Sequence, residues 1–133
     1  VDHYRDLYPF LKDQPKFLFE YGQCLSKTGQ YEEGIRILTE GTRLSADPMF
    51  YNIMGKDAEA LKHFGQAEAC FKQASYMVPH RLYPLYLLAK MYFESGQSEK
   101  GRDMARQVIQ KEPKVMSDAV KEMKAELEER LKP

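Results

Sequence analysis

The stretch AEACFKQASYMVPHRLYPLYLLAKMY, residues 67–92, decides the fold of this chain. In its first half Ala67, Phe71 and Ala74 are spaced by four and three residues, so they share one face of a helix. Pro79 predicts the end of that helix, because proline cannot continue the helical hydrogen bonds. The second half places leucines and tyrosines on one side of another helix. The stretch therefore predicts two helices that pack closely, with small alanines at their contact.

Three positions of this pattern recur along the chain with one period. Each is a small or turn residue, and its successive copies are separated by 33 and then 34 residues. Because three positions keep the same spacing, we predict three copies of one helical hairpin. The copies are Gly22, Gly55 and Ala89 in the first helix, Gly29, Lys62 and Gly96 in the turn, and Gly34, Ala67 and Gly101 in the second helix.

The order A-x3-F-x2-A-x4-P in residues 67–79, followed by a helix rich in leucine and aromatic residues, resembles the tetratricopeptide repeat (TPR). That family has W-x2-L-G-x2-Y, then A-x3-F, then P, at a period of about 34 residues. The resemblance implies an all-α fold: a right-handed α-α superhelix of three TPR helical hairpins plus a C-terminal capping helix. The expected single TPR domain, 1–133, consists of 1–14 as the tail of a truncated preceding repeat, 15–47 as TPR 1, 48–81 as TPR 2, 82–115 as TPR 3 and 116–133 as the capping helix.

The N-terminal residues admit two interpretations. Tyr4 and Leu7 fall where the apolar pair of a second helix would lie if a further repeat preceded them, and the alternative is an unrelated N-terminal arm. Proline disfavours helix at the residue before it, so Tyr8-Pro9 predicts a break at residue 8. Pro15 suits the first position of a helix and is expected to begin the first repeat.

Lys62 stands at a turn position that is glycine in the other two repeats. Either Lys62 adopts the left-handed backbone that glycine favours, or the turn differs and Gly65 compensates. In the first hairpin, glycine replaces the usual alanine at Gly34 and Gly41, which lowers helix propensity by up to about 1 kcal/mol each. We therefore expect this hairpin to be the looser one.

The last residues predict an amphipathic helix. Ser117 is a suitable N-cap, with Asp118 in the first turn. The face opposite the apolar stripe is charged, and we expect Glu126 and Arg130 to pair across one turn. Such a helix suits the exposed end of a repeat stack, and a coiled-coil partner helix is the alternative. The apolar stripe consists of Val120, Met123, Leu127 and Leu131.

Length and composition exclude several classes of function. The chain has 133 residues, enough for one domain with one core, and its 20 basic and 20 acidic residues cancel. A balanced charge argues against binding of nucleic acid, which requires a basic excess. The longest apolar run, residues 85–89, is too short for membrane insertion, and the polar first residues are unlike a secretory signal. The chain lacks an initiator methionine, which is consistent with a fragment of a longer protein.

No constellation of catalytic or metal-binding residues is visible. The three histidines lie far apart in the repeat pattern, and no hydrolase, metalloprotease, phosphate-loop or dinucleotide-binding motif occurs. Cys24 and Cys70 fall on different helices of different repeats, so we interpret both as packing residues, with a disulfide or metal pair as the minor alternative. We therefore expect no enzyme activity, no catalytic residue, no metal and no cofactor in this chain.

The TPR resemblance implies a concave face, lined by the first helix of each repeat, that holds a protein or peptide ligand. Lys56 and Lys90 are in register in neighbouring repeats and could both reach one acidic group of such a ligand. The alternative is that they form ordinary surface pairs with Glu59 and Glu94. The candidate ligand-binding residues are Phe19, Gln23, Asn52, Lys56, Tyr83, Tyr86, Lys90 and Phe93, within a lining that also includes Lys16, Ser26, Met49 and Glu59.

The Lys/Asn clamp by which some TPR cochaperones hold a C-terminal carboxylate is not reproduced. Phe19 stands in place of its lysine in the first repeat, and Leu87 stands in place of a basic residue in the third. A receptor for chaperone tails is therefore not expected.

A second resemblance concerns the whole chain. The strings RDLYPFLKDQPKFLFEYGQ, PHRLYPLYLLAKMYFESGQ and VMSDAVKEM, within residues 4–124, resemble the soluble C-terminal TPR region of bacterial O-antigen ligase-like membrane proteins. The resemblance implies a membrane-embedded parent of cell-surface glycan assembly, whose transferase chemistry lies outside this chain. The expected function is thus a non-enzymatic interaction module of such a ligase, and the alternative is a free-standing peptide-binding TPR adaptor or scaffold.

Overall fold

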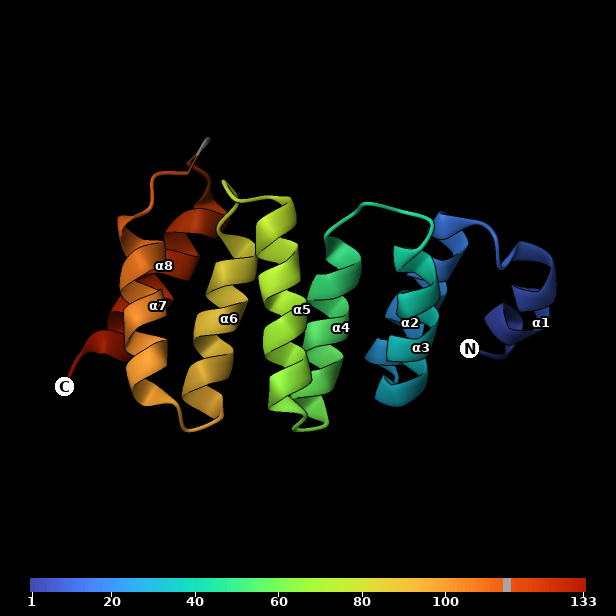
Figure 1. Cartoon of the computed structure of the whole chain (residues 1–133), viewed down its shortest axis with the longest axis horizontal. Coiled ribbons are helices and arrows are strands. Elements are labelled where there is room, and N and C mark those ends of the chain that lie inside the picture. The colour runs from blue at the N-terminus through green and yellow to red at the C-terminus, as the bar shows by residue number, and fades with distance from the viewer. Residues whose placement is uncertain (114–115) are drawn as a thin grey trace. The chain divides into compact units, whose positions relative to one another are not determined.

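The computed structural model describes residues 1–113 and 116–133, and within these ranges it is helical with no strand (Figure 1). The predicted all-α fold is confirmed. Short turns join α2 to α3, α4 to α5 and α6 to α7, which gives the helical hairpins that the period predicts. The helices are α1 (Asp2–Leu11), α2 (Pro15–Lys27), α3 (Tyr31–Thr42), α4 (Met49–Ala60), α5 (Phe64–Met77), α6 (Tyr83–Glu94), α7 (Ser98–Gln110) and α8 (Asp118–Leu131).

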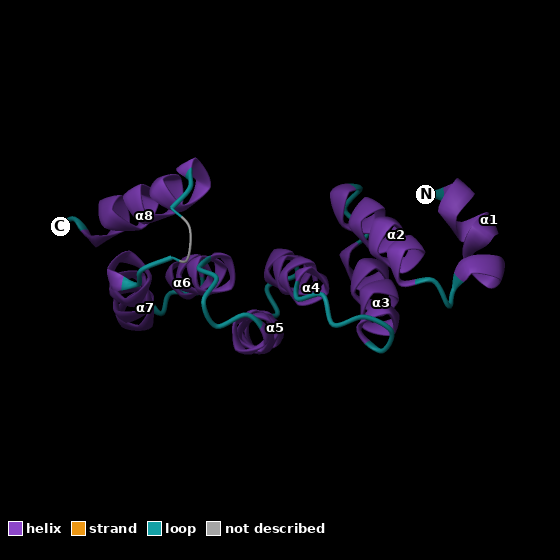
Figure 2. Ribbon diagram, turned by 90° about the horizontal axis from the view of Figure 1, so that it is seen from above, coloured by secondary structure: helices purple, strands orange, loops and turns teal. Residues whose placement is uncertain are grey.

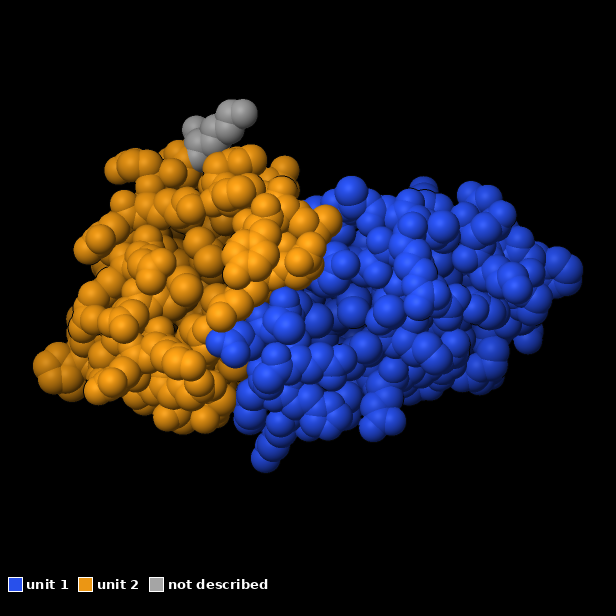
Figure 3. Space-filling model, in the orientation of Figure 1, with its two compact units in different colours: residues 1–70 blue, residues 71–133 orange. Residues whose placement is uncertain are grey.

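Internal contacts divide the chain into two compact units, Val1–Cys70 and Phe71–Pro133 (Figure 3). The boundary falls inside α5, so unit 1 holds α1 to α4 with the start of α5, and unit 2 holds the remainder. The residue limits of the repeats stay a prediction, and the expected end of the third repeat at Val115 lies outside the described residues.

Helix α1 continues through Pro9 to Leu11, so the predicted break at residue 8 is wrong. The reason is packing within unit 1, against α2 and α3. The ring of Tyr4 stacks on that of Tyr21 in α2 with centroids 5.6 Å apart, and the Tyr8 hydroxyl donates a hydrogen bond to Glu40 of α3. Such tertiary contacts outweigh the local preference of a residue before proline, as they commonly do for short helices.

The three hairpin turns share one backbone geometry. Gly29 and Gly96 have φ of 81° and 82°, and Lys62 has φ of 61°, so the lysine takes the left-handed backbone. Gly65 does not compensate, because it lies within α5. At each turn the next amide donates to a carbonyl five residues back, as from His63 to Ala58 at 2.8 Å, which satisfies the helix end.

Two glycines of the first hairpin allow close approach of neighbouring side chains. A methyl group added at Gly22 would overlap the Leu38 side chain, and one at Gly41 would overlap the Phe50 ring. Gly41 therefore belongs to the contact between α3 and α4, which is among the most extensive helix contacts of unit 1. Its low helix propensity is offset by the packing that it permits.

We expect Gly41→Ala to lower the free energy of unfolding by about 1–2 kcal/mol, because overpacking outweighs the gain in helix propensity. The matched control is Gly65→Ala, where nothing lies within 4 Å of the added methyl group. That change should stabilise by up to about 1 kcal/mol. Urea denaturation of the two variants measures the difference, and equal signs for both would contradict close packing at Gly41.

Unit 2 is closed by α8, which contacts both α6 and α7 (Figure 2). The Ser117 side chain accepts a hydrogen bond from the amide of Val120 at 3.2 Å, so the predicted N-cap is confirmed. Leu127 is fully buried, and the rest of the predicted stripe is half-buried against the same cluster. This packing on the last hairpin agrees with the capping interpretation. The cluster also contains Leu82, Ala89, Ala105 and Val108.

Candidate functional site

Two adjoining hollows lie along the groove between α2 and α4 in unit 1, with volumes of about 390 and 330 Å³. Gln23 of α2 lines both, so it marks their junction. We call them the Phe19 hollow and the Asp57 hollow. The Phe19 hollow is lined further by Lys16, Phe19, Glu20, Asp47 and Phe50, and the Asp57 hollow by Ser26, Lys27, Tyr31, Ile53, Lys56 and Asp57.

The structure brings together three of the predicted site residues in this groove: Phe19, Gln23 and Lys56. The Phe19 ring meets the Phe50 ring edge-on with centroids 5.2 Å apart, which gives the first hollow a rigid aromatic wall. Lys56 is exposed, and Gln23 is half-buried. These three side chains therefore line one groove of unit 1.

Asn52 is not on the groove surface as predicted, because only 2% of it is exposed. Its amide donates to the sulfur of Met49 at 3.4 Å, and its oxygen Oδ1 has no hydrogen-bond partner among the described residues. Asn52 thus lies on the buried side of α4. The helical period alone did not separate it from the exposed positions of that helix.

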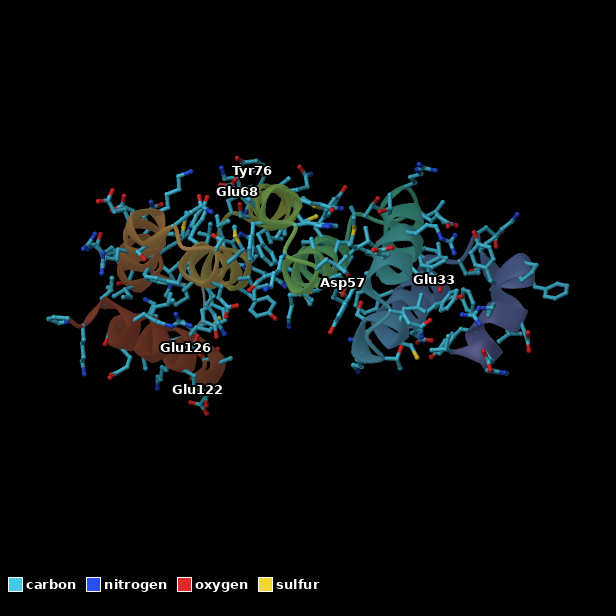
Figure 4. All side chains as sticks on the ribbon, turned by 90° about the horizontal axis from the view of Figure 1, so that it is seen from below. Glu33, Asp57, Glu68, Tyr76, Glu122 and Glu126 are labelled. Atoms are coloured by element: carbon cyan, nitrogen blue, oxygen red, sulfur yellow. The ribbon has the colours of Figure 1, made fainter. Side chains whose placement is uncertain are left out.

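The candidate residues of unit 2 are engaged by the chain's own C-terminal helix. Lys90 Nζ lies 3.2 Å from the Tyr86 hydroxyl and 3.4 Å from the Glu126 carboxylate of α8. Figure 4 labels Glu126 on the side of α8 that faces α6. Arg130 of α8 lies over the Phe93 ring, 5.4 Å from its centroid. The α6 face is therefore covered in part by α8.

This arrangement corrects one expected ion pair, because Lys90 pairs with Glu126 of α8 rather than with Glu94 of its own helix. The charge of Arg130, whose guanidinium lies over the Phe93 ring, also acts on Glu126. Burial opposes the charge on Lys90, but the Tyr86 oxygen and the Glu126 carboxylate outweigh it and raise the pKa of Lys90. The hydrogen bond from Tyr86, with the charge of Lys90, lowers the pKa of Glu126 despite partial burial. Tyr83, the remaining candidate, stacks on Tyr86 with centroids 6.2 Å apart.

Asp57 is a functional candidate that the sequence analysis missed. It is 2% exposed, on α4, and its Oδ2 accepts a hydrogen bond from the Ser26 hydroxyl of α2 at 2.8 Å (Figure 4). Behind it, a methyl group added at Gly34 of α3 would lie 3.0 Å from the same oxygen. Burial raises the pKa of Asp57 to about 6, against the lowering effects of the Ser26 hydrogen bond and the Lys56 charge.

The position of Asp57 in the helical period could have indicated from the sequence that this residue is unusual. The buried apolar side of α4 includes Phe50, Met54 and Ala58, and Asp57 follows Met54 by three residues on that side. An acidic residue in a buried register is an informative exception, because charged side chains are seldom fully buried without a partner.

Among the residues that the structure describes, no group of three or more histidine, cysteine or acidic side chains could hold a metal ion. Among the same residues, no helix has the length and apolar character needed to cross a membrane.

Both cysteines are free thiols, and burial, together with the Asp57 charge, raises the pKa of Cys70 to about 11. A thiol in that state is a poor nucleophile at neutral pH.

Two segments of the chain, residues 15–48 and residues 85–114, match models of the tetratricopeptide repeat. Each match spans a helical hairpin described above, α2–α3 in unit 1 and α6–α7 in unit 2. Each of these two hairpins is therefore similar to a tetratricopeptide repeat. No curated protein matches the sequence.

Solved structures of similar fold include a crystal structure of MamA, with a TM-score of 0.73 and 15% identity over 96% of this chain and 84% of that chain. The Arabidopsis OM64 TPR domain gives a TM-score of 0.70 and 16% identity over 90% and 98% of the two chains. A chain of the CopN-Scc3 complex gives a TM-score of 0.74 and 16% identity over 97% of this chain and 75% of that chain. At these identities the likeness establishes the fold alone.

Proposed function

We propose that this chain is a non-enzymatic protein-interaction module that holds an extended polypeptide segment in the α2–α4 groove. The observation that carries the proposal is the pair of hollows that meet at Gln23. They combine a rigid aromatic wall with exposed cations, and binding surfaces use such aromatic anchors beside a polar rim. Tetratricopeptide repeats support a role in protein–protein interaction, and one structural neighbour is itself a complex of two proteins.

The groove of unit 1 is favoured over the predicted face of unit 2. On α6, Lys90 and Phe93 already contact Glu126 and Arg130 of α8, so a ligand there would have to displace those contacts. In the α2–α4 groove, the hollows are open, and Lys56 is exposed. The ligand site is thus expected to be smaller than the eight predicted residues suggest.

A peptide selection tests this proposal. A displayed library of random peptides is selected for binding to the full chain, and the affinity of the recovered peptides is then measured. We expect the recovered peptides to bind Gln23→Arg at least about tenfold more weakly than the wild type, because arginine fills the junction of the two hollows. The matched control is Gln107→Arg, the same substitution on the exposed surface of α7. Affinity for the control should stay within about twofold of the wild type.

Two results would contradict a groove that binds polypeptide. One is a selection that recovers no peptide. The other is equal weakening by Gln23→Arg and Gln107→Arg, which would place the ligand elsewhere. Circular dichroism of both variants establishes that neither change acts by unfolding the helices.

The finer proposal is that the chain is the soluble C-terminal part of an O-antigen ligase-like membrane protein. Its support is the resemblance within residues 4–124. The alternative, a free-standing adaptor, requires the same groove but no membrane parent. The complete reading frame separates the two: several apolar stretches of about 20 residues upstream favour the ligase parent, and a frame without them favours the adaptor.

A further inference from the structure

We propose that the Asp57 hollow receives a carboxylate of the bound polypeptide and that binding transfers a proton from solvent to Asp57. The inference rests on the proposed function, because it names the chemistry of the ligand at that same groove. It makes the groove selective for acidic segments, and more strongly so in mildly acidic solution.

The charge of the lining favours an anion in this hollow. Lys27 of α2 and Lys56 of α4 are both exposed on it, whereas its one acidic group, Asp57, is buried. The adjoining Phe19 hollow carries the opposite balance, with Glu20 and Asp47 against Lys16. A ligand carboxylate is therefore attracted to the Asp57 hollow and repelled from its neighbour.

The hydrogen bonds around Asp57 suit both of its protonation states. The Ser26 oxygen Oγ lies 2.8 Å from Asp57 Oδ2 and 3.0 Å from the backbone oxygen of Gly22, but its hydroxyl has one proton. When Asp57 is ionised, that proton points to the carboxylate. When Asp57 is protonated, the carboxyl donates to Ser26, and Ser26 donates to Gly22. Proton uptake thus needs no rearrangement of the helices.

The titratable groups around Asp57 come from each neighbouring helix. Lys27 of α2, Tyr31 of α3 and Lys56 of α4 line the hollow, and Cys70 of α5 is close enough that the Asp57 charge raises its pKa. Burial already raises the pKa of Asp57 to about 6. A ligand carboxylate in the hollow raises it further, because two neighbouring negative charges disfavour each other. By linkage, that ligand binds more tightly when protons are available.

For the test, peptides are selected from the displayed library against the full chain at about pH 5.5. Calorimetry then measures the affinity of the selected peptides at about pH 5.5 and about pH 7.5. We expect the peptides to be enriched in aspartate and glutamate. Wild-type affinity should be about three- to tenfold higher at the lower pH, with net proton uptake seen in buffers of different ionisation enthalpy. Asp57→Asn should remove this pH dependence, and Asp103→Asn, the same change on the exposed surface of α7, should retain it.

The outcomes separate the two proposals. Peptides rich in lysine and arginine, or a wild-type affinity that is the same at both pH values, would overturn the carboxylate site while leaving a polypeptide groove that Gln23→Arg disables. A pH dependence that survives in Asp57→Asn would also overturn it. Failure to recover any peptide, or peptides insensitive to Gln23→Arg, would overturn the proposed function itself.

Discussion

Replacing Leu127 by alanine is expected to lower the free energy of unfolding of unit 2 by about 2–5 kcal/mol. Leu127 is the one residue that α8 buries completely, and it packs with residues of α6 and α7, including Ala89 and Val108. Truncation leaves a cavity at the centre of that contact, because the helices cannot fully collapse around the smaller side chain. Urea denaturation followed by far-UV circular dichroism measures the loss.

The matched control is Leu131→Ala, one turn further along the same helix and only half-buried. We expect a loss of about 1 kcal/mol there, since less apolar surface leaves water. Hydrogen exchange over Asp118–Leu131 shows whether α8 detaches before the rest of the unit, as a terminal element of a repeat protein can. Equal effects of the two substitutions would mean that α8 does not dock through Leu127.

Detachment of α8 has a consequence for the predicted site. Lys90 would lose Glu126, and Phe93 would lose the Arg130 guanidinium that lies over its ring. The α6 face would then present the aromatic and cationic side chains that the TPR resemblance assigned to ligand binding. In the docked state, these contacts instead contribute to holding the cap.

The repeat period predicted local structure well because each hairpin is specified by nearby residues. Gly29 and Gly96 supply the left-handed backbone directly, and the same turn forms at Lys62, where only the period indicated it. Ser117 was recognisable as an N-cap from its own sequence neighbours. Such features depend on a few adjacent residues and on helical spacing, so they can be read without knowing the tertiary contacts.

The features that the sequence did not predict depend on contacts between distant segments. Helix α1 passes through Pro9 because its tyrosines pack on α2 and α3, which no local rule anticipates. Asn52 and Lys56 lie one turn apart on α4, yet one is buried and the other exposed. Glu126 forms an ion pair with Lys90, which lies 36 positions away in the sequence, and helical spacing does not indicate such a contact.

Asp57→Asn is expected to stabilise unit 1 relative to the wild type at neutral pH, and to lose that advantage in acid. The pKa of Asp57 is raised to about 6 in the folded chain, from an ordinary value of 3.8. The folded state therefore holds a proton that the unfolded chain releases between these values. Stability from this group is fully present below pH 3.8 and is lost as pH rises through about 6.

A shift of this size corresponds to about 2–3 kcal/mol between the two limits. Asparagine keeps the shape of the side chain and an oxygen that can accept from Ser26, but it does not titrate. The free energy of unfolding of the variant minus that of the wild type should thus rise by about 2–3 kcal/mol between about pH 4 and about pH 7.5. Taking the difference between the two proteins removes the titrations that they share.

Asp103→Asn is the matched control, because Asp103 is exposed on α7 and paired with Arg106 at 3.3 Å. Its stability difference should change little with pH, since surface ion pairs contribute about 0–1 kcal/mol. If Asp57→Asn behaves like this control, then Asp57 is ionised in the folded chain throughout the range. Its carboxyl would then have no proton to exchange near neutral pH. The proposed proton uptake in the Asp57 hollow, and the tighter binding of acidic segments at lower pH, would lose their physical basis.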